Sequence, residues 1–230
     1  MSHQNSGHTL QATGLIDEAY LRLAAGSDKD WNNQAHFFSV AAKAEWTHGN
    51  SLFELPDGNL LLSYRNISTV VKIDRRSGRV VWKLGIPPLS GQHALVALAN
   101  GNILLFDNGP TRLDETFPYS RVLEINPATN EIVWKYQDPN PTSFYSDRVS
   151  NAQRLPNGNT LINEGMFGRF FEVTSDGEVV WEYVSPYFGP PGTPPRTQTN
   201  GVFRAYRYTE EEVARARNAQ VNLKLENKKG

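Results

Sequence analysis

The 230-residue sequence contains no cysteine. This absence excludes disulfide bonds, thiolate catalysis, and zinc or iron–sulfur sites built on cysteine. The sequence also has no excess of charge of one sign, because 23 Lys and Arg stand against 24 Asp and Glu, a net charge of -1. Nucleic-acid-binding domains usually carry a strongly basic face, so this balance argues against nucleic acid as a partner.

Long apolar runs are missing as well. The sequence has no apolar stretch of about 18 residues, so no membrane-spanning helix is expected. Residues 1–11 are polar and lack the apolar core of an export signal. The chain as written is therefore expected to be cytoplasmic, and to be periplasmic or secreted if its N-terminus is truncated, so the compartment stays open.

A pattern that occurs three times dominates the rest of the sequence. Each copy has an apolar run, a turn ending in Gly-Asn, further apolar runs, and two apolar residues before a Trp. The copies cover 48–85, 93–136 and 151–183. Their final tryptophans, Trp82, Trp134 and Trp181, are 52 and 47 residues apart. This spacing is typical of a four-stranded propeller blade, which usually takes about 40–50 residues.

The turn chemistry of each copy favours β-structure. The turns contain Asp57-Gly58, Asn100-Gly101 and Asn157-Gly158. Such pairs supply the positive φ that hairpin turns need, and the flanking runs are short and rich in aliphatic and β-branched residues. One sheet cannot hide both of its faces, so the units must stack, with the repeated Trp packed between neighbours. We therefore predict an all-β protein of four-stranded, propeller-like blades with short terminal helices.

The sequence divides into three segments. We expect an irregular or helical N-terminal segment over 1–45, with a helix near 10–25, then blades over 46–208 and a C-terminal helix and tail over 209–230. A short strand is expected over 202–208, and a capping box starting at Thr209 opens the last helix.

The number of copies bears on closure of the ring. Closed propellers need about four to eight blades, and three copies are evident. Either the flanking segments add irregular blades, or the chain is the C-terminal part of a longer protein, which we favour. An open ring exposes sheet edges, which predicts a cover or a partner such as a second copy of the chain.

Polar residues recur where the first strand of a copy starts and its second strand ends, which is the same end of the sheet. His48 and His93 stand at the start of a first strand. Arg65 and Asn108 each follow their turn glycine by seven residues, and the same position in the third copy is Gly165. We therefore expect two imidazoles, a guanidinium and an amide on one rim of the central hollow. Nearby in the sequence are Asn50, Gln92 and Arg121.

These residues belong to short motifs that resemble a known family. The motifs are Trp46-Thr47-His48-Gly49-Asn50-Ser51, Leu62-Ser63-Tyr64-Arg65-Asn66, Gln92-His93, Phe106-Asp107-Asn108-Gly109 and Ser120-Arg121. In order and spacing they resemble the arylsulfotransferase family of propeller enzymes over about 46–186. That family moves a sulfuryl group from a phenolic sulfate ester to another phenol without a nucleotide sulfate donor. The resemblance implies that His93 matches the histidine that is transiently sulfated, and that His48 and Arg65 match residues that bind and polarise the sulfate.

The chemistry of these side chains agrees with the implied reaction. The planar guanidinium of Arg65 can bind two sulfuryl oxygens and keeps its charge. A neutral His93 can attack sulfur, and His48 can protonate the departing phenolate and later deprotonate the acceptor. We expect Asn50, Asn108 and Arg121 to contact substrate, and no metal or cofactor to be needed. The expected partners are an aryl sulfate and a phenol.

Other interpretations stay open. The chain could be a non-catalytic binding or interaction module that keeps the propeller scaffold. A quinone-dependent dehydrogenase ranks low, because it would need a calcium site and adjacent cysteines. The tryptophans are expected in the core, and Tyr145 lies in a loop that could cap the hollow. Arg204 and Arg207 are expected to pack against the last blade.

Overall fold

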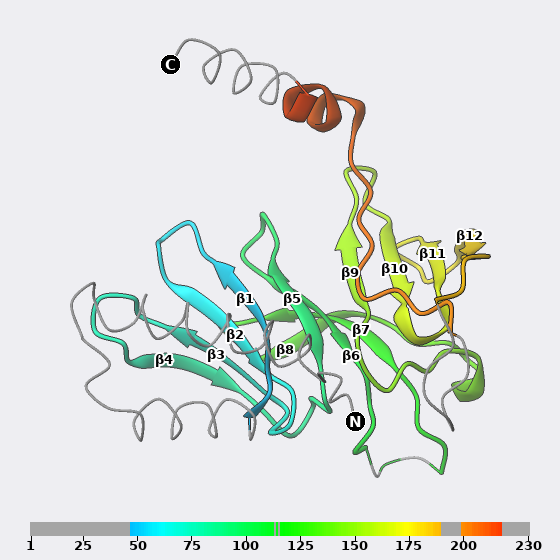
Figure 1. The fold of residues 1–230 in the computed structure, drawn as a ribbon. Helices are drawn as coiled ribbons and strands as arrows, with labels where there is room; N and C mark the ends of the chain where they lie inside the picture. Colours follow the sequence, from blue (N-terminus) through cyan, green and yellow to red (C-terminus); the bar gives the residue numbers. More distant parts are fainter. Residues whose placement is uncertain (1–46, 113, 115, 190–198, 218–230) are drawn as a thin grey trace, which may run out of the picture.

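The computed structural model describes residues 47–112, 114, 116–189 and 199–217 (Figure 1). In these ranges the chain forms three antiparallel four-stranded sheets, and within each sheet every strand pairs with the next along the chain. This topology confirms the predicted all-β fold of propeller-like blades. The expected N-terminal segment, 1–45, with its helix near 10–25, lies outside the described residues.

The strands are short and follow the three copies of the sequence pattern. The first sheet contains β1 (Gly49–Glu54), β2 (Leu60–Tyr64), β3 (Thr69–Ile73) and β4 (Val80–Leu84). The second sheet contains β5 (His93–Ala97), β6 (Ile103–Asp107), β7 (Arg121–Asn126) and β8 (Glu131–Tyr136). The third sheet contains β9 (Asn151–Arg154), β10 (Thr160–Glu164), β11 (Arg169–Val173) and β12 (Val179–Val184).

The turn between the first two strands is the same in every sheet. Its glycine, Gly58, Gly101 or Gly158, has a φ of 79°, 84° or 88°. Each glycine N–H donates to the carbonyl of the leucine three residues earlier, at 2.8, 2.9 and 3.0 Å. A side chain in this left-handed conformation is strained, which explains why the sequence repeats glycine at this point.

The three sheets pack against one another through their faces. Strand β1 contacts β5, and β5 contacts β9, so the first strands lie side by side in the middle of the molecule (Figure 1). Between the first two sheets the core includes Leu61, Val70, Leu95, Leu105 and Leu123. Between the second and third it includes Leu104, Phe106, Val122, Phe144 and Phe171. This arrangement sets the ends of the first strands next to one another.

The repeated tryptophans behave as expected only where a further sheet follows. Trp82 and Trp134 pack against the two core clusters. Their indole N–H groups donate to the next sheet, to Asn130 Oδ1 at 2.9 Å and to the Ser175 carbonyl at 2.7 Å. Trp181 is 43% exposed, so its expected core position is wrong. The reason is that no fourth sheet covers this face in the described part of the chain.

The C-terminal segment returns along the third sheet. Residues 202–208 lie beside β9 (Figure 1), but they bind its side chains rather than its backbone, so the expected strand is not formed. The amides of Asn151 and Gln153 each exchange two hydrogen bonds with the backbone, at Ala205 and Arg207. A helix follows over 210–217. None of the helices in the described ranges is both long and apolar enough to cross a membrane.

The predicted capping box opens this last helix. The Glu212 N–H donates to Thr209 Oγ1 at 3.2 Å, and the Thr209 N–H donates to Glu212 Oε2 at 2.7 Å. The two residues therefore satisfy each other's backbone donors, as a capping box requires.

Candidate functional site

His93 is the first residue of β5, and its side chain is buried. Only 4% of the residue is exposed. The ring Nδ1 lies 2.7 Å from Oδ1 of Asn108, which follows β6 directly. The pairing of β5 with β6 brings the two residues together, because His93 pairs with Phe106, which precedes Asn108 by two residues.

The surroundings of Asn108 fix the tautomer of His93. The Asn108 Nδ2 group donates to the carbonyls of Ser146 at 2.8 Å and Val149 at 3.1 Å. Both of its hydrogens are then used, and Oδ1 must be the atom that faces the imidazole. Since Oδ1 can only accept, Nδ1 of His93 carries the hydrogen and donates it. The neutral ring therefore has its lone pair on Nε2.

Burial holds the imidazole neutral. It lowers the pKa of His93 from 6.5 to about 3, chiefly because the charged ring would lose its hydration. The charges of Arg65 and His48 lower the pKa further, whereas the hydrogen bonds with the Asn108 side chain and the Gly91 backbone raise it. Arg65 and His48 are therefore close enough to the ring for their charges to act on it. His93 is thus a neutral nitrogen base beside positive charge.

The guanidinium of Arg65 does not use all of its hydrogen-bond donors. Its Nη2 donates to the Asp147 carbonyl at 3.1 Å and its Nη1 to Asn66 Oδ1 at 3.2 Å. Its Nε is buried and has no hydrogen-bond partner. Among the described residues no carboxylate pairs with this guanidinium; the Asp147 side chain lies 3.7 Å from Arg148 instead. A buried, unpartnered donor on a cation is costly, and an anion would satisfy it.

His48 and Asn50 bring the first sheet to the same rim. The His48 carbonyl accepts the Arg65 N–H at 3.0 Å, so the backbone holds these two residues opposite each other. The Asn50 Nδ2 donates to the Gln92 carbonyl at 2.8 Å, beside His93, and its Oδ1 is buried without a partner. Asn50 therefore lies between the two histidines.

The two histidines do not hold equivalent positions, contrary to expectation. His93 pairs with Phe106, which stands five residues after Gly101. In the first sheet the residue five positions after Gly58 is Ser63, and it pairs with Ser51. His48 lies farther out, opposite Arg65. Both first strands are irregular at this point, because each register shifts within the first residues of the strand. These bulges bring side chains from different registers to one rim.

Two of the expected substrate contacts, Asn108 and Arg121, bind other groups of the protein. Asn108 has no exposed surface, and its amide is occupied by His93 and two loop carbonyls. Asn108 therefore fixes the orientation of the His93 ring through this hydrogen bond. Arg121 donates to Asp107 Oδ2 at 2.7 Å and to the Pro88 carbonyl at 2.9 Å. Its guanidinium thus serves a buried ion pair, which a second arginine shares.

Tyr145 lies close to the rim, in the loop that could cap the hollow. Burial raises the pKa of its phenol, the Asp147 carboxylate raises it further, and the Arg65 charge lowers it. The influence of Arg65 shows that the phenol ring is near the guanidinium. Tyr145 therefore adds an aromatic side chain near the half-buried guanidinium of Arg65.

Arg204, which was expected to pack against the last blade, makes a contact with the first sheet that sequence reasoning did not predict. Its Nη2 donates to the Asn50 carbonyl at 2.9 Å, across 154 positions of sequence. The one signal in the sequence is Gly165, which breaks the pattern set by Arg65 and Asn108. A Cβ at Gly165 would lie 2.6 Å from the Val202 carbonyl oxygen. Glycine is needed there because the segment that carries Arg204 passes against it.

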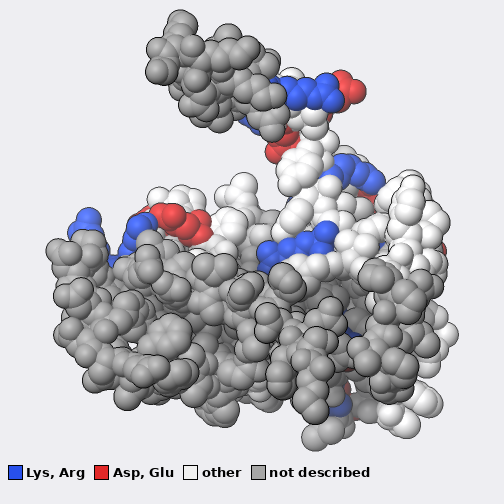
Figure 2. Space-filling view, viewed as in Figure 1, with Lys and Arg blue, Asp and Glu red and all other residues white. Residues whose placement is uncertain are grey.

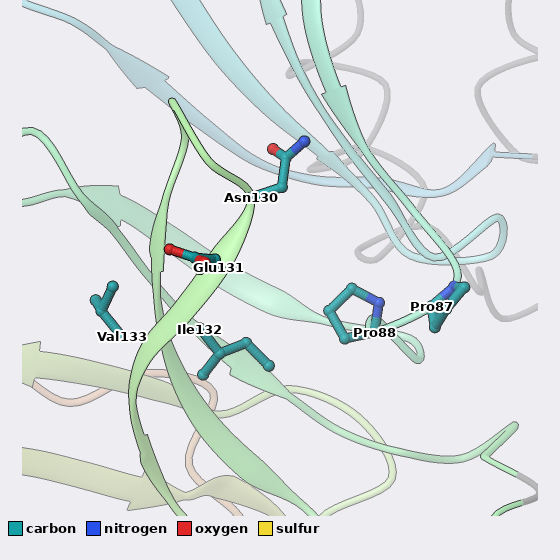
Figure 3. A pocket seen from close by; sticks show the side chains of 6 residues that line it. All are labelled: Pro87, Pro88, Asn130, Glu131, Ile132 and Val133. Atoms are coloured by element: carbon teal, nitrogen blue, oxygen red, sulfur yellow. The ribbon is translucent and has the colours of Figure 1, made fainter.

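Other surface features do not suit an anion or a metal. A hollow of about 520 Å³ lies between Pro87 and Pro88 on one side and Asn130–Val133 on the other (Figure 3). It contains no cation and none of the rim residues. No cluster of three or more His, Asp or Glu in the described ranges could hold a metal ion. Among the described residues visible in Figure 2, the basic ones form separate patches with white and red residues between them.

Comparison with known proteins gives a family and a fold. The model of a family described as arylsulfotransferase (ASST) matches residues 17–186. No curated protein matches. A crystal structure of a protein of unknown function from Bacteroides caccae is similar at 17% identity, with a TM-score of 0.50, over 71% of this chain and 50% of that one.

Two further structures are similar at lower TM-scores. A streptogramin B lyase has 19% identity and a TM-score of 0.45, and virginiamycin B lyase from Staphylococcus aureus has 17% and 0.44. Each match covers 61% of this chain and 42% of the lyase. The chain thus spans half or less of the length of the solved structures that it resembles.

Proposed function

Because the chain belongs to the arylsulfotransferase family, we propose that it moves a sulfuryl group from an aryl sulfate to a phenol, with His93 as the transient acceptor. The observation that supports this most is the state of His93. Its ring is buried and neutral, its Nδ1–H is held by Asn108, and it lies near the unpartnered Nε of Arg65. We assign the activity to the blades over 46–208, flanked by the segment 1–45 and the C-terminal helix and tail over 209–230.

In the first step Nε2 of His93 attacks sulfur. A nitrogen–sulfur bond forms, and the bond from sulfur to the aryl oxygen breaks with its electron pair going to that oxygen. His48 gives the departing oxygen its proton. Arg65 binds the oxygens of the sulfuryl group, whose transfer should be loose by analogy with phosphoryl transfer, so positioning and charge stabilisation are the main tasks of the protein.

The tautomer of His93 prepares the second step. Because Nδ1 keeps its hydrogen, the sulfated ring carries a positive charge, which makes imidazole a good leaving group. Asn108 Oδ1 accepts from that nitrogen and stabilises the charge. A phenol that loses its proton to His48 then attacks sulfur, the nitrogen–sulfur bond breaks, and the ring returns to its neutral form.

The test is release of 4-nitrophenol from 4-nitrophenyl sulfate with phenol as acceptor. His93→Asn should abolish release, and Arg65→Gln should lower kcat/KM by about 100- to 1000-fold, as loss of one charge-stabilising donor does. Arg148→Gln, which removes an exposed arginine from the neighbouring loop, is the matched control and should change little. Intact-mass measurement without acceptor should show an adduct of about 80 Da on the wild-type protein and none on His93→Asn.

The same assay addresses the alternative function. Equal release by the wild-type protein and all three variants would be background hydrolysis. In that case the proposed transfer would be wrong, and a non-catalytic module on the same scaffold would be the better interpretation.

A further inference from the structure

The C-terminal segment occupies the place of a first strand in a fourth sheet. Arg207 forms an ion pair with Glu172 of β11, and its guanidinium lies 5.1 Å from the ring centre of Trp181. In the preceding sheet Arg154 of β9 does the same: it lies 2.7 Å from Glu124 of β7 and 4.6 Å from the ring centre of the tryptophan in β8. Arg207 therefore corresponds to Arg154, one sheet farther on.

This correspondence gives Arg204 the position of His93. Arg204 precedes Arg207 by three residues, as Asn151 precedes Arg154. Asn151 in turn holds the position of His93, because each of them pairs with the residue five positions after its turn glycine. The residue of the C-terminal segment that corresponds in position to His93 is thus an arginine.

The side chain of Arg204 reaches across to the first sheet. Its Nη2 lies 2.9 Å from the Asn50 carbonyl oxygen. The Asn50 side chain binds the residue next to His93, and His48 is two residues away. The first strands run in the order β1, β5, β9 and then the C-terminal segment (Figure 1), so the contact joins the last unit to the first. The guanidinium lies on the rim that carries His48, Arg65 and His93.

We infer that Arg204 is a second anion-binding residue of this site, which holds the sulfate group of the donor together with Arg65. The inference rests on the proposed function. A guanidinium has five N–H donors, and the hydrogen bond to Asn50 uses one of them. No carboxylate in the described part of the chain pairs with Arg204, so its remaining donors and its charge can meet a sulfate oxygen. A sulfate ester has three terminal oxygens, enough for two arginines.

The test compares Arg204→Gln with Arg204→Lys and with Arg207→Gln. Arg207 lies on the same segment but packs against the third sheet, so its variant controls for loosening of the segment. Binding of inorganic sulfate is measured by titration calorimetry, and kcat and KM are measured with 4-nitrophenyl sulfate. Arg204→Gln should weaken sulfate binding about tenfold or more, the effect of one charge-assisted hydrogen bond. Arg204→Lys should recover part of the sulfate affinity, because lysine keeps the positive charge but lacks the planar guanidinium that can bind two oxygens.

The kinetics separate binding from structure. Loss of a residue that holds the donor equally in the ground state and the transition state raises KM and leaves kcat nearly unchanged, and we expect this result for Arg204→Gln. Arg207→Gln should lower the free energy of unfolding while the sulfate affinity stays at the wild-type value. Equal sulfate affinity in the wild-type protein and Arg204→Gln would overturn the inference, and so would an equal loss in Arg204→Gln and Arg207→Gln.

The outcome for the inference is distinct from the outcome for the proposed function. If sulfate binds, and Arg204→Gln alone weakens it, but no sulfuryl transfer occurs, the anion site stands and the proposed reaction is wrong. If transfer occurs but the wild-type protein does not bind sulfate and KM is unchanged in Arg204→Gln, the reaction stands and the role of Arg204 is wrong.

Discussion

Replacement of His93 by asparagine tests whether the imidazole is held neutral. The amide nitrogen of asparagine is as many bonds from the backbone as Nδ1, so His93→Asn can keep the hydrogen bond to Asn108 and remove only the titrating ring. We expect the wild-type protein to lose stability relative to this variant as the pH falls below about 6.5.

The magnitude follows from the two pKa values of the ring. In the unfolded chain the pKa of His93 is 6.5, and in the folded protein it is about 3. Below pH 6.5 the unfolded state binds a proton that the folded state does not, so the free energy of unfolding falls with the pH until the folded pKa is reached. The slope is about 1.4 kcal/mol per pH unit, which gives about 2 kcal/mol between pH 6.5 and 5.

Urea unfolding of both proteins at about pH 7.5, 6.5, 5.5 and 4.5 measures this difference. Carboxylates whose pKa values are lowered by hydrogen bonds, such as Asp57 and Glu172, also cost stability in acid. They are present in both proteins, so their effect cancels in the comparison. Nitrogen-detected NMR of the imidazole provides an independent measurement, and it should report a neutral Nδ1–H ring at pH 5.5.

Two results would refute the reasoning. The first is a stability difference that does not change with pH, and the second is an NMR spectrum of a cationic ring at pH 5.5. Either one would mean that His93 is protonated in the range where we assign it a free lone pair. The proposed nucleophile would then be unavailable over much of that range.

Three further predictions concern neighbouring residues. Asn108→Asp should raise the pKa of the imidazole it contacts, so the pH–rate profile should gain a decline toward acid pH that the wild-type protein lacks. Arg121→Gln should lower the free energy of unfolding in urea by about 2 kcal/mol and leave transfer per folded molecule unchanged, because Asp107 loses one of two cations. Gly109→Ala should lower the free energy of unfolding by well over about 2 kcal/mol, since the new Cβ would lie 2.0 Å from a carbonyl oxygen. Gly101→Ala, at a φ of 84° with open space around it, should lower it by about 1–2 kcal/mol. Similar thermal unfolding of the two variants would contradict this prediction.

The sheets could be predicted from the sequence because their causes are local. A turn such as Asp57-Gly58 fixes a hairpin through the φ of one residue, and short aliphatic runs on either side supply the strands. Repetition of the same turn at Gly101 and Gly158 then gives three similar sheets. The neighbouring positions of Arg65 and Asn108 follow from the same counting, since both stand seven residues after a turn glycine.

The details of the rim could not be predicted, because they depend on bulges and on contacts that are distant in sequence. Ala94 has a φ of 50°, which the local sequence does not predict. The register of β5 against β6 shifts at this residue, directly after His93. Arg204 reaches Asn50 only because the last segment returns along β9. Counting positions within one copy of the pattern predicts neither the register shift nor the contact between Arg204 and Asn50.

The pairing of charges distinguishes the rim from the rest of the protein. Elsewhere in the sheets, arginines form ion pairs with buried carboxylates. Arg154 pairs with Glu124, and Arg121 pairs with Asp107. At the rim the described carboxylates leave Arg65 and Arg204 unpaired, although the net charge of the whole chain is -1. In the proposed reaction the guanidiniums attract the sulfate ester and the neutral imidazole of His93 is the nucleophile. A protonated His93 would add a third positive charge but lose its lone pair, so the burial that keeps the ring neutral is the condition on which the proposed attack depends.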